Sequence, residues 1–107
     1  MKMLTKEVEK RIPELYSHDG KDAAEVPVAV KFFDPSGSFT WYVTEGNKLE
    51  NGDWSFFGLV DSGFYSELSY FRLSDLLNAK TGLRGLKALP IERDLNYSGT
   101  LKDALGE

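Results

Sequence analysis

The chain has 107 residues, a formal net charge of −4 and no cysteine. This length suits one domain over residues 1–107, and the lack of cysteine excludes disulfides, thiolate metal sites and cysteine nucleophiles. The apolar stretches are too short to cross a bilayer, and the N-terminal residues have no apolar run typical of a signal peptide. We therefore expect a cytoplasmic protein with no membrane partner.

Residues 4–16 are predicted to form the first helix. Apolar side chains recur there at helical spacing, at Leu4, Val8, Ile12 and Leu15. Thr5 is the expected N-cap. Pro13 has no N–H to donate, so we expect the helix to kink at this residue, or to end and restart there.

Four strands are predicted next. Segments rich in β-branched and aromatic residues, bounded by turn signals, cover 26–33, 39–45, 54–61 and 67–73. The segment 54–61 is apolar on both faces, so we place it inside the sheet. A tight reversal at Asn51-Gly52 precedes it.

A short helix capped by Ser74 follows, then an extended segment over 89–95 and a last helical turn capped by Thr100. This order of elements predicts the α+β class. We expect an antiparallel meander sheet of about four strands, with an N-terminal helix and a short helix after the last strand.

The sequence contains none of the motifs of common active sites or metal sites. The single histidine, His18, lies in a polar loop with no partnered nucleophile, so we expect it to be solvated rather than catalytic. Glu50, Asn51 and Asp53 offer oxygen ligands but lack the spacing of a calcium loop. We predict neither a metal nor a cofactor.

Charge is distributed unevenly along the chain. Seven acidic and two basic residues give the segment 34–75 a charge of −5, whereas the rest of the chain carries +1. Nucleic-acid backbones require a basic footprint, so we do not expect direct nucleic-acid binding. An acidic segment suits a protein partner with a basic surface. Base stacking by the tryptophans is an alternative, although Trp41 lies in register with apolar neighbours typical of a core.

Arg93 stands in line with three aliphatic residues in the segment 89–95. An arginine that enters an apolar layer needs a partner, because an unpaired buried charge is very costly. We expect a structural ion pair between Arg93 and either Glu45 or Glu67, since a guanidinium suits a carboxylate. The alternative is an active pocket lined by Arg93 and these carboxylates.

Five ordered blocks of the sequence resemble a family of small bacterial proteins described only as a domain of unknown function. The blocks are LTKEVEKRIPELYS, VKFFDPSGSFTWYVTEG, DWSFFGLVD, ELSYFRLSDL and LPIERDL. Ser69 stands where the family pattern has glycine, and Arg72 stands where it has a small polar residue. The resemblance implies a protein from plasmids, phages or integrated elements, and it implies no catalytic residue.

These observations lead to one functional expectation and two alternatives. We expect a non-enzymatic, protein-binding accessory factor of a mobile genetic element, of the kind that inhibits a host defence nuclease (anti-CRISPR or anti-restriction). Its expected contact surface is formed by Glu45, Glu50, Asp53 and Trp54. The alternatives are a small hydrolase or nucleic-acid-processing enzyme with a carboxylate/Arg93 site, and a single-stranded nucleic-acid binder.

Overall fold

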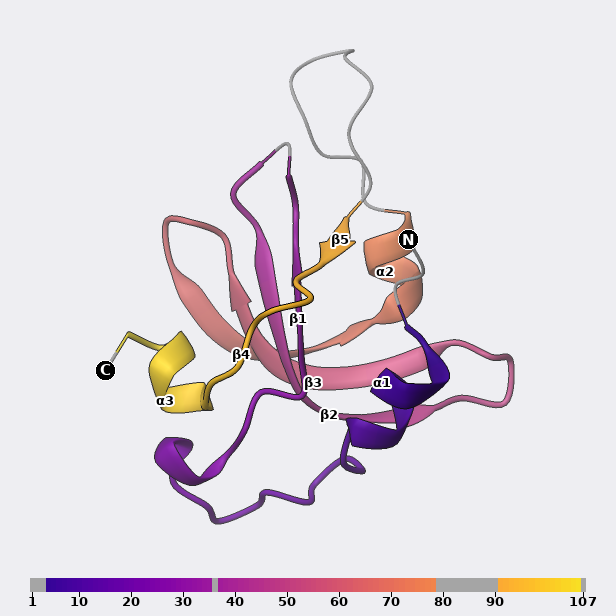
Figure 1. Cartoon of the computed structure of the whole chain (residues 1–107), viewed down its shortest axis with the longest axis horizontal. Coiled ribbons are helices and arrows are strands. Elements are labelled where there is room, and N and C mark those ends of the chain that lie inside the picture. Colours follow the sequence, from indigo (N-terminus) through magenta and orange to yellow (C-terminus); the bar gives the residue numbers. More distant parts are fainter. Residues whose placement is uncertain (1–3, 36, 79–90, 107) are drawn as a thin grey trace.

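The computed structural model describes residues 4–35, 37–78 and 91–106. Within them, five antiparallel strands form one sheet in the order β4-β3-β2-β1-β5 (Figure 1). The strands are β1 (Val30–Phe33), β2 (Thr40–Lys48), β3 (Trp54–Asp61), β4 (Ser66–Arg72) and β5 (Glu92–Arg93). The helical elements are α1 (Lys6–Arg11), the 3-10 helix η1 (Ala23–Glu25), α2 (Leu73–Leu77) and α3 (Leu101–Ala104). The α+β class is confirmed, with β5 as an additional short strand.

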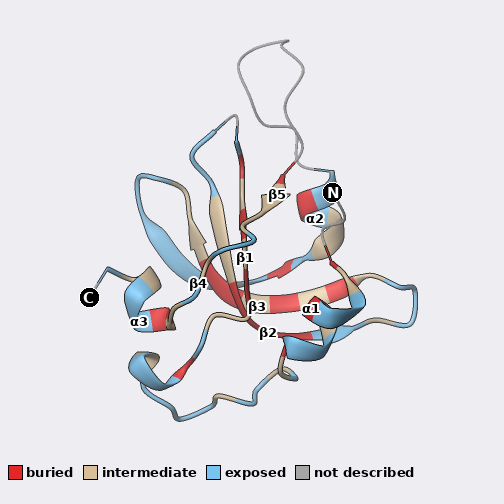
Figure 2. Cartoon of the chain, in the orientation of Figure 1, coloured by how far each residue is buried: buried red, intermediate tan, exposed pale blue. Residues whose placement is uncertain are grey.

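One face of the sheet carries the main core. Phe32, Val43 and Phe56 are completely buried on this face. The helices α1 and α2 cover it, and Val8 and Leu76 are their buried contributions (Figure 2). Burial of large aromatic and aliphatic side chains between a sheet and its helices is the main source of stability in a two-layer domain.

The opposite face of the sheet is covered only in part. Leu59 is buried there against Val26, which follows η1, and against Leu101 of α3. Farther toward the sheet edge, β4 presents Leu68 and Tyr70 on the same face, and both side chains are exposed (Figure 2). We call this side the partly covered face.

The first helix is shorter than the predicted 4–16. Thr5 caps α1 as expected, since its hydroxyl oxygen accepts a hydrogen bond from the Val8 N–H. The helix ends at Arg11, and Ile12 is already extended. Pro13 explains this end, because proline disfavours the helical conformation in the residue before it.

The strand predicted over 26–33 begins only at Val30. The chain before it pairs with the C-terminal segment instead: the Val28 N–H donates to the Gly99 carbonyl, and Pro27 forms an isolated bridge with Thr100. The strand predicted over 54–61 is confirmed in extent and in its place inside the sheet. An inner strand is at least partly covered on both faces, which explains why β3 carries apolar residues on both.

The predicted N-cap of the short helix is wrong. The helix α2 begins at Leu73, so Ser74 lies inside it and Arg72 occupies the capping position. The Arg72 N–H donates to the carboxylate of Asp75, which satisfies one of the free donors of the helix start. Thr100 caps α3 as predicted, in a reciprocal arrangement with Asp103.

A bulge shifts the register of β2 against β3 between Val43 and Glu45. Beside it, the β2 and β3 backbones lie very close: a Cβ added to Gly58 would lie 1.8 Å from the Tyr42 carbonyl oxygen. After the bulge, Glu45 pairs with Phe57 and so lies on the partly covered face. The bulge therefore decides which way the Glu45 carboxylate points.

Candidate functional site

Glu45 anchors the chain after α1 to the sheet. Its side chain is buried, and its two carboxylate oxygens accept hydrogen bonds from the Tyr16 N–H (2.9 Å) and the His18 N–H (2.8 Å). The His18 ring adds a contact from Nδ1 at 3.1 Å. A buried carboxylate needs such donors to offset its desolvation. The anchor therefore fixes the backbone of residues 16–18.

Tyr16 has an unusual backbone conformation at this anchor. Its φ of +73° lies in the left-handed region, which costs a residue with a Cβ about 1–2 kcal/mol. The Tyr16 side chain nevertheless points outward and is 61% exposed. Interaction with the Tyr16 side chain is the main reason that the pKa of Tyr70 is raised; burial and the charges of Asp19 and Glu45 raise it further.

Exposed apolar side chains gather on and beside β4. Phe64 and Tyr65 form the turn before the strand, Leu68 and Tyr70 lie along it, and the Tyr16 side chain interacts with that of Tyr70. We call these five residues the β4 apolar row: Tyr16, Phe64, Tyr65, Leu68 and Tyr70. Their exposed fractions run from 49% for Leu68 to 94% for Phe64. The Phe57 ring beneath packs against Tyr70 with centroids 4.9 Å apart, which supports the row from inside the sheet.

The sequence that carries β4 and its flanking turns is acidic. Over residues 61–75 three acidic residues, Asp61, Glu67 and Asp75, stand against one base, Arg72, for a charge of −2. Glu67 is exposed on the strand itself. An excess of acidic residues in this part of the chain attracts basic partners and repels acidic ones.

The contact surface expected from the sequence does not form as a unit. Glu45 is buried in the anchor, and Trp54 is buried in the main core, where it stacks on Phe56. Asp53 is half-buried and ties the β2–β3 turn to α2: it accepts hydrogen bonds from the Ser74 hydroxyl (2.7 Å) and N–H (3.0 Å). The Ser74 hydroxyl is also the main reason that the pKa of Asp53 is lowered. Of the four expected residues, Glu50 alone is exposed.

The structure does not bring Arg93 beside Glu67, one of the two partners expected from the sequence. Arg93 pairs with Phe32 in the sheet, and the same cross-strand row continues to Glu67 at the opposite edge. Four strand spacings separate the two, about 19 Å. Both carboxylate oxygens of Glu45 accept hydrogen bonds in the anchor, and Glu45 pairs with His18. Lys31 pairs with Asp94.

Lys31 holds the segment after β5 against the partly covered face. Its ammonium lies 3.7 Å from the Asp94 carboxylate and over the rings of Tyr42 and Tyr97, at 5.5 and 4.9 Å from their centroids. The two rings meet edge to face. Burial is the main reason that the pKa of each tyrosine is raised. This cluster covers the β5 side of the sheet and leaves the β4 side open.

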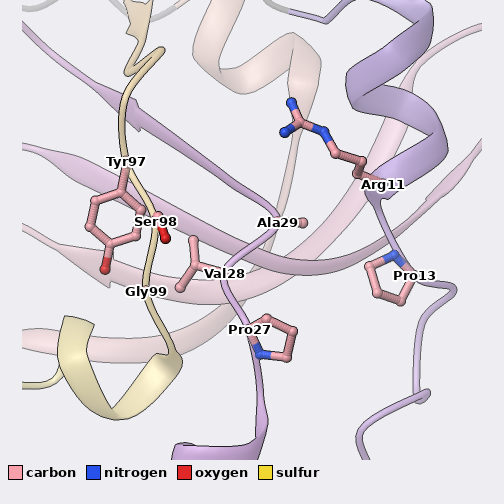
Figure 3. A pocket seen from close by; sticks show the side chains of 8 residues that line it. All are labelled: Arg11, Pro13, Pro27, Val28, Ala29, Tyr97, Ser98 and Gly99. Atoms are coloured by element: carbon pink, nitrogen blue, oxygen red, sulfur yellow. The ribbon is translucent and has the colours of Figure 1, made fainter.

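One cavity of about 330 Å³ lies between the end of α1 and the C-terminal segment. Figure 3 shows Arg11 on one side of the chain at Ala29, with Tyr97 and Ser98 on the other. Among the described residues, the lining has one guanidinium, that of Arg11, and no carboxylate or imidazole. The His18–Glu45 pair has the distances of a base and its orienting carboxylate, but it lines neither this cavity nor the one beside Gly46 and Trp54.

Among the described residues, no helix has the length and apolar character needed to cross a membrane. The same part of the chain brings no three histidine, aspartate or glutamate side chains together in the arrangement of a metal site.

Comparison with known proteins identifies a family. The model of a family described as "Protein of unknown function (DUF2958)" matches residues 3–103. No curated protein and no solved structure matches the chain.

Proposed function

We propose that this chain, which belongs to the DUF2958 family, binds another protein and acts without catalysis. The observation that supports this function is the β4 apolar row, in which five large side chains face water. Single exposed apolar residues are normal, whereas a gathered set marks an interaction surface. Tyrosine and other aromatic residues also contribute most of the energy at many protein interfaces.

The proposed partner has a basic surface. The charge of −5 over residues 34–75 supports this choice, because opposite charges speed association and exclude wrong partners. The setting that we propose is a mobile genetic element, with a host defence nuclease as the partner. Nucleases carry basic channels for their substrates, and an acidic apolar strip suits the rim of such a channel.

The test is capture of the partner by the immobilised chain from a nuclease-treated host lysate. Phe64→Ser combined with Tyr65→Ser removes the two most exposed aromatic side chains of the turn. Leu95→Ser is the matched control, because Leu95 is 64% exposed but lies beyond β5 at the other side of the sheet. We expect one stoichiometric protein that is lost with the double variant and kept with the control.

Two outcomes would contradict the proposal. The first is equal capture by the double variant and the wild-type chain, which would place the contact elsewhere. The second is the absence of any stoichiometric protein. Salt-dependent quenching of tryptophan fluorescence by single-stranded oligonucleotides would instead support the nucleic-acid alternative; given the acidic surface, we expect no such quenching.

A further inference from the structure

The strand β4 is an open edge of the described sheet. Its partner on one side is β3, with a regular register over all seven residues and no bulge. The strand contains no proline, and its charged residues are Glu67 and Arg72. Proteins usually protect an edge of this length by bulges, prolines, lysines or a covering segment, because free N–H and C=O groups invite another strand. The other edge, β5, has only two residues and carries the Lys31 cluster beside it.

The main-chain groups of every second β4 residue point away from β3. The Thr44 hydroxyl donates to the Phe57 carbonyl from the β2 side at 3.1 Å, so Phe57 directs its main chain toward β2. Its β4 partner Tyr70 then directs its own N–H and C=O outward. Leu68 lies two residues before Tyr70, so its N–H and C=O also point outward. The main chain of Arg72 also points outward, because its N–H donates to the Asp75 carboxylate, which lies outside the sheet.

The outward-directed residues also carry the exposed apolar side chains. Leu68 and Tyr70 lie on the partly covered face, and Glu67 projects from the opposite face between them. The side chains of a strand added to this edge alternate between the two faces. Those on one face lie next to Leu68 and Tyr70, and those on the other face lie next to Glu67. The side chains next to Leu68 and Tyr70 must be apolar, and the one next to Glu67 is favoured when it is basic.

We propose that β4 receives an extended segment of the partner as a sixth strand, and that this segment alternates apolar and basic residues. The inference rests on the protein-binding function proposed above and names its mode. Main-chain hydrogen bonds to Leu68 and Tyr70 supply affinity, while the row and Glu67 select the sequence. A second copy of this chain is a poor occupant, because the charge of −2 over residues 61–75 would meet the same charge.

The test uses a capped heptapeptide of alternating lysine and valine as the probe. Amide exchange is followed by NMR on the full chain, with and without the peptide. In the free chain we expect the Leu68 and Tyr70 amides to exchange rapidly and the Glu67 and Ser69 amides, which face β3, to be protected. The peptide should slow exchange at Leu68 and Tyr70 at least about tenfold. A heptapeptide of alternating glutamate and valine should leave both amides unchanged.

Two variants separate the main chain from the side chain. Leu68→Ala and Leu68→Pro both remove the leucine, but only proline also removes the outward N–H. We expect the proline variant to bind the lysine–valine peptide at least about tenfold more weakly than the alanine variant. If the proline variant does not fold, strand addition is still tested by the wild-type chain, through the change in amide exchange at Leu68 and Tyr70 when the lysine–valine peptide is added.

The results distinguish the mode from the function. A partner that depends on Phe64 and Tyr65 in the capture experiment, combined with unprotected Leu68 and Tyr70 amides, would overturn strand addition and keep protein binding. Equal protection by the lysine and glutamate peptides would overturn the basic character of the occupant. A concentration-dependent dimer whose exchange at these amides is slowed without peptide would show that a second copy occupies the edge, which would also overturn the inference.

Discussion

Removal of the Glu45 carboxylate tests the anchor directly. In Glu45→Ala, the N–H groups of Tyr16 and His18 and the His18 ring lose their acceptor. A hydrogen bond to a charged group contributes about 1.5 kcal/mol or more, and the loss is partly offset because the carboxylate no longer has to be desolvated. We expect the free energy of unfolding to fall by about 3 kcal/mol, measured by urea denaturation with the fluorescence of buried Trp54 as the probe.

Smaller changes at the anchor should cost less. Glu45→Gln keeps the shape and one acceptor oxygen, so we expect about half of that loss, and His18→Ala removes the ring contact alone, for about 1 kcal/mol. Glu50→Ala is the matched control, since Glu50 is an exposed glutamate in the next turn and should change stability by less than about 0.5 kcal/mol. The reasoning is refuted if Glu45→Ala costs no more than Glu50→Ala.

Three further predictions concern the turns and the Lys31 cluster. The lowered pKa of Asp53 gives stability that is present above about pH 4 and is lost as pH falls further. The urea midpoint of Asp53→Asn should therefore fall less steeply below about pH 4 than that of the wild-type chain, and an equal fall in both proteins would contradict this. Gly58→Ala should cost about 3 kcal/mol or more by urea denaturation, because its Cβ would meet the Tyr42 carbonyl; a near-neutral result would exclude that close approach. Tyr97→Leu should cost about 1 kcal/mol, and a double-mutant cycle with Lys31→Met should show coupling if the cation–π contact is its source.

Local chemistry explains which parts of the fold could be predicted. Thr5 and Thr100 cap their helices because hydroxyl caps act within three residues. The segment 54–61 was identifiable as an inner strand because burial on both faces requires apolar residues on both. The start of the short helix was not predictable in this way. Asp75 accepts from the Arg72 N–H and Asp53 accepts from the Ser74 N–H, and Asp53 lies in a turn 21 residues before Ser74.

The candidate site depended on information that the sequence does not carry. Glu67 and Arg93 do share one face and one cross-strand row, but the order of the strands separates them, and strand order is a property of the whole sheet. The role of Glu45 was missed because a bulge reverses its direction. One signal for the β4 apolar row was present: Phe64 and Tyr65 follow Gly63 directly, and a turn is a poor place to bury two aromatic rings.

Tyr16 links the stability of the anchor to the proposed function. A left-handed residue with a Cβ is costly, and glycine at this position would avoid the strain. Compared with Tyr16→Ala, which keeps the strain, Tyr16→Gly should therefore unfold at higher urea, with a difference of about 1 kcal/mol. Both variants should capture the partner equally weakly, because both remove the same ring from the β4 apolar row. Equal stability of the two variants would show that the backbone there relaxes, and undiminished capture would remove Tyr16 from the contact surface. A glycine variant that is more stable yet weaker in capture would mean that the chain keeps a strained residue because its side chain binds.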